Sequence, residues 1–421
     1  MYPDFVLALD CGAEFDPARE DDFFAALPNR PAVYLIEPRA QDSKPFLSRT
    51  VDLRRAAERL LRRPETATKR LNLREVAARI RYRLTGSRFE QLLTVYQHAR
   101  LHFPSRYRDF VRLRPPAVVK INLRNAYPRC YVTRHISADE AMYVGPFASR
   151  RAAEFFADGF RDLFKVRRCQ IKIRRDPRFP GCIYSEMKMC LAPCFGGCTD
   201  VEYTAEVSRA AKALASSGAS LESEFERERE AASEALDFER AAALHKKLEK
   251  VSDAMKSLPE LARRVDHLDA VILQRAAEEN AVAFFPIRDG LIAEPFFLRF
   301  GELSSQPRSV EAILRERLEG NITAENVGPV LSSITKAVQS QSGEAPVTLP
   351  ELRATFGLRA VPADLQEHLS LVARWFYAKP REGEIFFRDA GWPYRRLLRA
   401  CARILAPPDA AESATPAAPA N

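Results

Sequence analysis

The cysteines of this 421-residue chain are concentrated in one short region. Four of the eight fall in the stretch CIYSEMKMCLAPCFGGC, residues 182–198, and Cys169 lies shortly upstream. In a reducing compartment, clustered thiols more often bind metal or take part in redox chemistry than form disulfides. The stretch also contains Pro and Gly, so we expect an irregular segment that something other than a hydrophobic core holds together.

The spacing of the cysteines bears on the choice of ligand. Four thiolates can hold a zinc ion or an iron–sulfur cluster. A zinc ribbon typically uses two C-x2-C pairs, and this chain contains none. The spacers of twelve, seven and three residues fit a larger cofactor better, with zinc and a set of buried free thiols as alternatives. The four candidate ligands are Cys169, Cys182, Cys190 and Cys194.

The net charge of +9 and the pI near 9.2 favour anionic partners. Residues 51–125 hold 19 Lys and Arg against 6 Asp and Glu, an excess of +13, and a second basic run covers residues 161–178. Charge clustered in this way favours binding to DNA or RNA. The residues expected to contact DNA are Arg54, Arg55, Arg62, Arg63, Arg167 and Arg168.

Two observations bear on the compartment. No run of about 18 apolar residues is present, so no membrane-spanning helix is expected. The N-terminal stretch lacks the basic region and the cleavage site of a signal peptide. We therefore expect a cytoplasmic protein without a membrane partner.

The pattern of apolar and polar residues predicts an α+β chain of several domains. Two helices should meet near residues 235–242 as an antiparallel hairpin, with Asp237 as the N-cap of the second. Asp289 and Gly290 indicate a β-hairpin. Strands are expected at 30–38, 44–50, 117–123, 141–147, within 265–300 and at 328–333. Helices are expected at 51–63, 72–84, 88–103, 150–168, throughout 203–258, at 308–318 and within 365–404.

Three stretches resemble the UvrC family of bacterial excision-repair nucleases, in the family's order. GCIYSEMKMCLAPCFGGCTDVEY resembles its cysteine segment, and YVGPFASRRAAEFFADGFRDLFKVRRC resembles the segment that leads into the first cysteine. LDFERAAALHKKLEKV resembles the UVR helical hairpin, through which UvrC meets UvrB. More faintly, AVYLI and FLSRTVDLRR resemble the GIY-YIG nuclease domain. The resemblance covers about residues 28–260.

The resemblance implies a domain order and a cofactor. Cys169, Cys182, Cys190 and Cys194 would carry a [4Fe-4S] cluster, with zinc as the alternative, whereas Cys198 lies outside the family's pattern. The chain ends before the family's second nuclease domain. The implied parts are a degenerate GIY-YIG-like α/β domain (1–110), a strand and helix region with the cysteine cluster (111–200), a UVR-like helical hairpin (201–260), an α/β connecting domain (261–405) and a disordered tail (406–421).

The implied nuclease site has lost several of its groups. Tyr34 keeps the first tyrosine of the pattern, and Arg49 keeps a basic residue. Phe46, Ala56 and Val95 stand where the family has a tyrosine, an arginine and a metal-binding glutamate. We therefore expect a nuclease fold without nuclease activity, which would use Mg²⁺ only if the site were active.

The hairpin implies a protein partner. Phe238 occupies the family's tip position, so the resemblance implies binding to a UvrB-like protein; the alternative is a helical linker that packs on its own chain. The predicted function is that of a DNA-binding protein of nucleotide excision repair without nuclease activity. The alternatives are an active DNA incision endonuclease and a module that senses redox state or binds proteins through its cluster.

Overall fold

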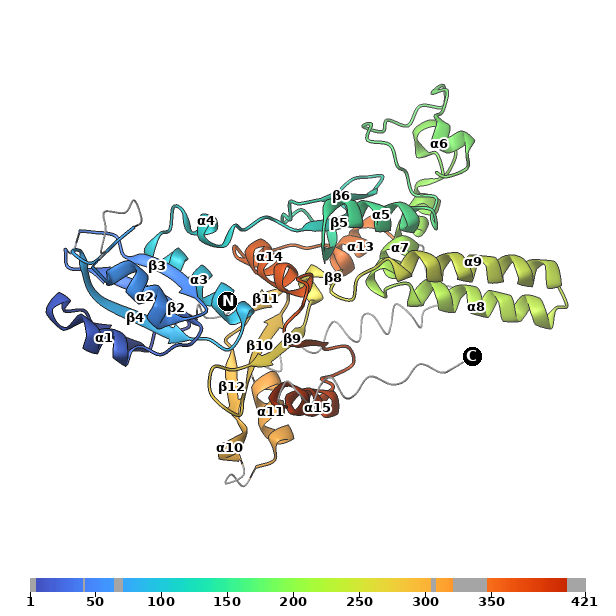
Figure 1. Cartoon of the computed structure of the whole chain (residues 1–421). Coiled ribbons are helices and arrows are strands. Elements are labelled where there is room, and N and C mark those ends of the chain that lie inside the picture. The colour runs from blue at the N-terminus through green and yellow to red at the C-terminus, as the bar shows by residue number, and fades with distance from the viewer. Residues whose placement is uncertain (1–4, 41, 64–70, 304–307, 321–346, 407–421) are drawn as a thin grey trace, which may run out of the picture.

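The computed structural model describes residues 5–40, 42–63, 71–303, 308–320 and 347–406. Three antiparallel sheets and their helices form an α+β chain of several parts, from which a helical hairpin and a cysteine-containing lobe project (Figure 1). The strand expected at 328–333 and the tail beyond residue 406 lie outside the described residues. None of the described helices is both long and apolar enough to span a bilayer.

The N-terminal sheet has the strand order β1-β4-β2-β3. Along β2, Tyr34 and Ile36 pack against α1 and α2, whereas Val33 and Leu35 face the cluster that contains α3. Successive side chains of a strand point to opposite faces, so the two groups mark the two sides of this sheet. The elements are β1 (Cys11–Glu14), β2 (Ala32–Pro38), β3 (Phe46–Thr50), β4 (Ala77–Leu84), α1 (Glu20–Ala26), α2 (Leu53–Leu61) and α3 (Arg88–His102).

Two of the expected helical regions are wrong in part. Residues 72–84 contain strand β4, because apolar residues alternate there with Arg79, Arg81 and Arg83, which is the period of a strand. The helical region within 365–404 is interrupted by strand β13, which pairs with β9 through a short apolar run that local periodicity does not distinguish from helix. The helix expected at 150–168 ends at Arg161.

The second sheet, with order β6-β5-β7-β8, carries α5 and α7 against one face. From this base the α8–α9 hairpin extends outward, as predicted (Figure 1). The Asp237 side chain accepts the Arg240 N–H at 3.0 Å, which confirms the predicted N-cap. The elements are β5 (Ala117–Ile121), β6 (Cys130–Thr133), β7 (Met142–Phe147), β8 (Arg263–Arg264), α5 (Arg150–Arg161), α7 (Asp200–Ala215), α8 (Ala219–Glu234) and α9 (Phe238–Lys256).

The third sheet has the order β11-β10-β9-β13, with β12 also on β10. Asp289 (φ 49°) and Gly290 (φ 77°) form the predicted hairpin turn between β10 and β11. Helices α11 and α15 cover one face, and α14 packs on the other. The elements are β9 (Ala270–Arg275), β10 (Ala281–Arg288), β11 (Leu291–Ile292), β12 (Phe296–Arg299), β13 (Glu384–Phe387), α10 (Phe300–Leu303), α11 (Val310–Glu319), α13 (Leu349–Phe356), α14 (Leu365–Phe376) and α15 (Tyr394–Leu405).

Helix α3 joins the first sheet to the third. Every residue from Phe89 to Ala99 is buried, so the helix is enclosed on all sides. The Phe89 ring lies 5.2 Å from Phe285 of β10 and 5.8 Å from Trp375 of α14. One apolar cluster therefore runs from the N-terminal sheet through α3 to the C-terminal sheet.

Glu367 of α14 connects α14 to α3 and to the segment that follows α3. Its carboxylate accepts hydrogen bonds from the Tyr96 hydroxyl (2.7 Å), the Tyr107 hydroxyl (2.6 Å) of α4 (Tyr107–Val111) and Arg108 Nε (2.9 Å). Burial, reinforced by this carboxylate, raises the pKa of both tyrosines.

Replacing Glu367 with Ala should lower the free energy of unfolding by about 3 kcal/mol, because two tyrosine hydroxyls lose their acceptor in a buried site. Urea unfolding followed by tryptophan fluorescence measures the loss. The matched control is Glu279→Ala, on the exposed loop between β9 and β10, which should leave the midpoint unchanged. Equal effects of the two substitutions would contradict the prediction.

Candidate cysteine centre and nucleic-acid interface

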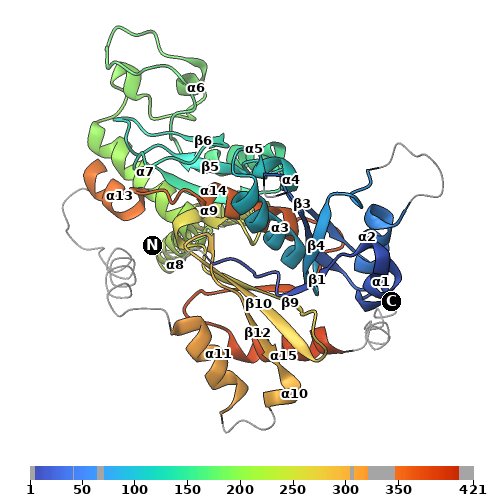
Figure 2. The same cartoon turned by 90° about the vertical axis from the view of Figure 1, so that its left-hand side faces the viewer.

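The cysteine lobe, residues 169–198, projects from the second sheet in two perpendicular views (Figures 1 and 2). No residue from 169 to 191 is buried, and the lobe's regular structure is the short helix α6 (Ile183–Glu186) and one 3-10 turn, Pro193–Phe195. Left-handed backbone at Ala192 (φ 58°) and Gly196 (φ 79°) turns the chain sharply around Cys194. The lobe therefore has irregular structure and almost no apolar core, as expected from its sequence.

The four predicted ligands lie in this lobe, near enough for the charges of three of them to act on Cys190. Burial raises the pKa of Cys190 to about 11, and the neighbouring Cys169, Cys194 and Cys182 raise it further by charge repulsion. The Ala192 N–H lies 3.3 Å from Cys190 Sγ, and it lowers that pKa in part. Arg167 Nη1 lies 3.8 Å from Cys169 Sγ.

N–H donors reach two of the sulfurs, and such outer contacts orient and stabilise metal-bound thiolates. Among the described residues, no three His, Cys, Asp or Glu side chains lie close enough to hold a single metal ion. Cys198 differs from the four, because its buried side chain packs in the apolar cluster of the second sheet.

One part of the expected nuclease site lies on the α2 face of the N-terminal sheet. Tyr34 is 1% exposed, and its ring lies 6.3 Å from that of Phe46. Ala56 is buried in the same cluster. Burial raises the pKa of Tyr34, and the neighbouring Ser48 and Arg59 side chains oppose the shift.

Arg59 is a contact that the sequence did not predict. It lies three residues after Ala56 on the same helix, so both side chains lie on the same side of α2. The three-residue spacing from Ala56 was the one feature of the sequence that could have pointed to Arg59 as a neighbour of this site.

The other part of the expected site lies on the opposite face. Arg49 pairs with Val33 across β2 and β3, which directs its side chain toward α3. Arg49 and Val95 line a cavity of about 330 Å³. The five residues expected in one site are thus divided between the two faces of the sheet.

The carboxylate one turn before Val95 is engaged elsewhere. Glu90 is 1% exposed and accepts hydrogen bonds from the Gly86 N–H (2.9 Å) and Arg83 Nε (3.1 Å). Burial raises the pKa of Glu90, and these two donors oppose the shift. Glu90 therefore stabilises the loop before α3 and does not line the cavity.

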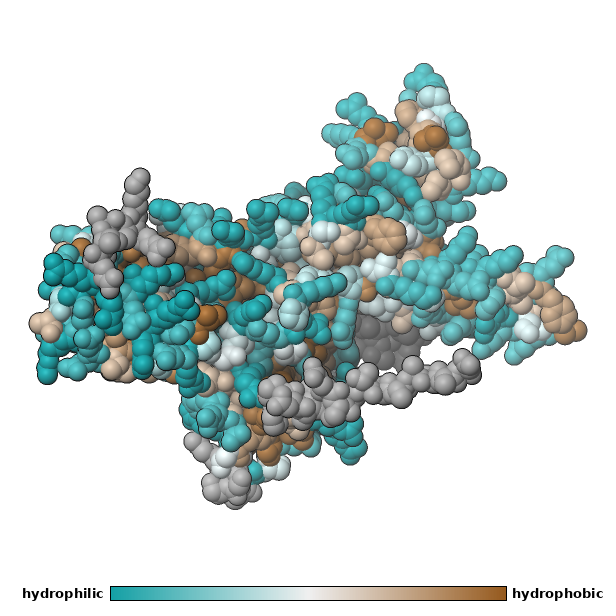
Figure 3. Space-filling view, viewed as in Figure 1, coloured by the Kyte–Doolittle hydropathy of each residue, from teal (hydrophilic) through white to brown (hydrophobic). Residues whose placement is uncertain are grey.

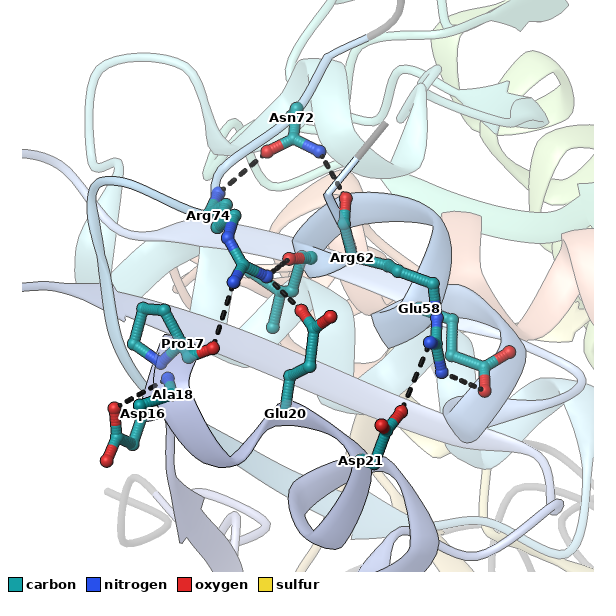
Figure 4. Close-up of polar contacts among 10 residues, drawn as sticks. Asp16, Pro17, Ala18, Glu20, Asp21, Glu58, Arg62, Asn72 and Arg74 are labelled. Carbon is teal, nitrogen blue, oxygen red and sulfur yellow. Dashed lines mark hydrogen bonds and ion pairs between the residues drawn. The ribbon is translucent and has the colours of Figure 1, made fainter. Parts of the chain in front are cut away.

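Two of the arginines expected at the DNA in the first basic region have internal partners. Arg54 donates to the carbonyls of Leu27 and Ala25, both at 2.8 Å. Arg62 forms ion pairs with Asp21 and Glu58, beside a polar network around Arg74 (Figure 4). The other two, Arg55 and Arg63, are exposed and make no ion pair with a described residue.

In the second basic region, both expected arginines have internal partners, and those of Arg167 include the start of the cysteine lobe. Arg167 is 5% exposed and donates to the carbonyls of Tyr127 (2.7 Å), Cys169 (3.0 Å) and Ile171 (3.1 Å). Arg168 pairs with Asp162 at 2.7 Å.

Other basic residues cover the outside of the lobe. Among four such side chains, only one, Arg178, forms an ion pair with a described residue. The sequence did not single them out, because three of them belong to the basic run 161–178, in which every position looks alike, and Lys188 lies outside that run. They are Lys172, Arg174, Arg178 and Lys188, and all are exposed.

The free end of the α8–α9 hairpin is apolar. Leu236 is 72% exposed and Phe238 68%. Figure 3 shows this apolar group at the end of the hairpin, beyond the polar surface of the two helices. The structure thus places Phe238 at the tip, as predicted.

Comparison with known proteins gives a consistent result. Residues 117–213, which hold β5, β6 and β7 of the second sheet, α5, the cysteine lobe and most of α7, match the family model of the UvrC/Cho excinuclease middle domain. A "UvrABC system protein C" of Dehalococcoides mccartyi is 26% identical over 360 residues, which cover 81% of this chain and 56% of the relative. That of Methanothermobacter thermautotrophicus is 28% identical over 300 residues, which cover 69% of this chain and 48% of the relative.

The chain is similar to the UvrC family over most of its length. The resemblance predicted from the sequence is thereby confirmed. A third relative, from Ruminiclostridium cellulolyticum, is 29% identical over 186 residues, or 44% of this chain and 30% of the relative. The chain spans about half the length of the first two relatives. No solved structure matches it.

Proposed function

We propose that this protein binds DNA in nucleotide excision repair and that its GIY-YIG-like domain has no nuclease activity. The observation that carries the proposal is the cavity beside Arg49. Val95 lines it where the family has a metal-binding glutamate, and no carboxylate lines it among the described residues.

The chemistry of phosphodiester cleavage needs groups that this cavity lacks. A divalent ion polarises the phosphoryl oxygen and positions the attacking water, and it needs a carboxylate anchor. Tyr34 is 1% exposed and lies on the other face of the sheet. Phe46 has no hydroxyl, and Ala56 carries no charge to neutralise the transition state.

Wild-type protein should therefore show no incision of DNA above background with Mg²⁺ or Mn²⁺, because each missing group typically costs on the order of a hundredfold in rate. Val95→Glu alone should not restore cutting, whereas the triple variant Phe46→Tyr, Ala56→Arg, Val95→Glu is the one expected to regain some. A gel assay on labelled duplex DNA checks both statements.

The Arg59 contact with Tyr34 is the observation that favours a residual activity. Robust cutting by wild-type protein that Tyr34→Phe or Arg59→Ala abolishes would show that the site has been rebuilt, and would overturn this proposal.

DNA binding is proposed from the exposed basic side chains. Arg55 and Arg63 on α2, and Lys172, Arg174 and Lys188 on the cysteine lobe, are exposed and unpaired among the described residues. Cations placed in this way neutralise backbone phosphates and release counterions.

The affinity for duplex DNA should fall linearly on a plot of log K against log salt. Combined substitution of Lys172 and Arg174 by Gln should reduce the slope by about two, at roughly 0.9 per phosphate contact. Replacing Arg62 by Gln is the control, because that side chain is held by Asp21 and Glu58. An affinity that is the same at low and high salt would contradict the proposal.

A [4Fe-4S] cluster held by Cys169, Cys182, Cys190 and Cys194 is proposed for the lobe. When bound, it supplies iron–thiolate bonds that can replace a missing apolar core. The support is the proximity of the four thiols, the N–H donors to sulfur, and a segment without buried residues from 169 to 191. Arg167 orients the start of the lobe through three carbonyls.

Anaerobically purified protein should contain about four irons and four sulfides per chain. Cys190→Ser should lose most of the iron and make residues 169–198 sensitive to limited proteolysis. Cys198→Ser should keep the iron, because Cys198 packs in an apolar cluster. Stoichiometric zinc without iron in the same preparation would show that the cysteines hold zinc and not an iron–sulfur cluster.

A UvrB-like protein is proposed as the partner of the hairpin tip. A two-helix unit cannot bury its own apolar end, so exposed Leu236 and Phe238 suit a complementary surface. Binding of purified UvrB should be lost in Phe238→Ala and kept in Glu230→Ala, an exposed position on α8. Equal binding of UvrB by both variants would show that Phe238 is not part of the UvrB contact.

A further inference from the structure

A second group of arginines lies where the N-terminal and C-terminal parts meet. The cavity of about 330 Å³ beside Arg49 is also lined by Arg112, which follows α4, and by Arg374 of α14. Strand β3, α4 and α14 lie around α3 in both views (Figures 1 and 2). We call the cavity lined by Arg49, Arg112 and Arg374 the arginine pocket.

A second cavity, of about 240 Å³, adjoins the arginine pocket. It shares Arg49 and Arg374 with it and adds Arg88. Arg88 is neutralised by Glu382, whose carboxylate lies 3.1 Å from the guanidinium and also accepts the Arg88 N–H at 2.8 Å. The two cavities thus form one basic recess along the free edge of β3.

The positive charge of the pocket is uncompensated. No described carboxylate forms an ion pair with Arg49, Arg112 or Arg374, in a chain whose other arginines form many such pairs. Partial desolvation, followed by the nearby charges of Arg374 and Arg88, lowers the pKa of Arg49. Arg49, Arg112 and Arg374 are all exposed, so their guanidinium groups can reach an anion from solvent, and a bound anion offsets the repulsion among their like charges.

The type of donor and the rim indicate which anion fits. Guanidinium groups donate several hydrogen bonds in a planar fork that matches phosphate oxygens. Phe110 lines the same pocket, is 38% exposed and is supported from behind by Phe103, with ring centroids 4.8 Å apart. An exposed aromatic ring beside a basic groove is a surface on which a nucleic-acid base can stack.

We propose that the arginine pocket binds one backbone phosphate of a single nucleic-acid strand through Arg49, Arg112 and Arg374. The adjacent base stacks on Phe110. This proposal rests on the proposed DNA binding and adds a specific contact to it. The contact needs no divalent ion, because no carboxylate lines the pocket among the described residues.

The position of the pocket adds a consequence for the fold. Arg49 comes from the first sheet and Arg374 from the helix that packs on the third, so a strand in the pocket contacts both parts at once. Arg374 also donates to the Val111 carbonyl, which places its guanidinium at the mouth of the pocket. Strand binding should therefore stabilise the junction around α3.

The test uses the full chain and a labelled single-stranded DNA oligonucleotide, with fluorescence anisotropy measured in EDTA. Arg374→Gln and Arg49→Gln should each weaken binding about tenfold and lower the salt slope by about 0.7. Arg374→Lys keeps the charge but not the fork and should lose less. Arg395→Gln is the matched control, since it removes an exposed arginine from α15, away from the pocket.

Phe110 tests the base contact separately. Phe110→Ala should weaken binding of the normal strand about tenfold and leave binding of an abasic strand unchanged, whereas Phe110→Tyr should bind both as the wild type does. Because Arg49, Arg374 and Phe110 come from three different elements, a folding defect in one variant leaves the other two as tests.

The outcomes separate this proposal from the general one. If DNA binding is salt-sensitive and the lobe variants weaken it, but Arg374→Gln and Arg49→Gln have no effect, the proposed phosphate contact in the pocket is wrong. The more general proposal of DNA binding would then still hold. No binding of DNA by wild-type protein would overturn both. Competition by free mononucleotide or inorganic phosphate at oligonucleotide concentrations would overturn the assignment to a strand.

Discussion

The burial of α3 between two sheets is the constraint on which the rest of the structure depends. Its residues from Phe89 to Ala99 are enclosed, and its apolar side chains belong to the N-terminal and C-terminal clusters at once. Such a helix has no solvent face, so the polar groups on it need internal partners. Tyr96 finds one in Glu367, Gln97 accepts the Leu7 N–H at 3.0 Å, and Glu90 accepts donors from the loop before it. The first and third sheets are therefore one packed body, and the arginine pocket forms where that body opens at the edge of β3.

The cysteine lobe is stabilised in a different way. It leaves the second sheet after Arg168 and returns at Cys198, and no side chain between 169 and 191 is buried. Buried apolar area cannot account for its order, and the contacts that hold it are polar, such as those of Arg167 with carbonyls and of Arg175 Nη2 with the Cys198 carbonyl (2.6 Å). A segment without a core can expose most of its basic residues, as Lys172, Arg174 and Lys188 do. The same irregularity makes the lobe suited to an anionic surface.

The arginines of this chain divide into two groups by what they contact. One group holds the fold, as Arg54, Arg62 and Arg167 do through carbonyls and carboxylates. The other group has no such partner among the described residues, and includes Arg49, Arg55 and Arg112. Net charge does not distinguish the groups, because an arginine that binds a carbonyl contributes the same formal charge as one that faces solvent. Contacts, rather than clustering in the sequence, identify the residues available for phosphate.

The sequence by itself determined most of the local elements and the grouping of the cysteines in one irregular lobe. Alternation, apolar runs and the Asp289-Gly290 turn predicted most strands correctly, and helical periodicity with Asp237 as a cap predicted the α8–α9 hairpin, because these signals act over a few residues. The missed strand β4 carried its signal too, in arginines that alternate with apolar residues. Only the tertiary structure decided that Tyr34 and Val95 lie on opposite faces of one sheet, because strand register and helix packing assign faces. Only the tertiary structure brought Arg374 to Arg49, since no local pattern relates residues that meet through the packing of separate sheets around α3.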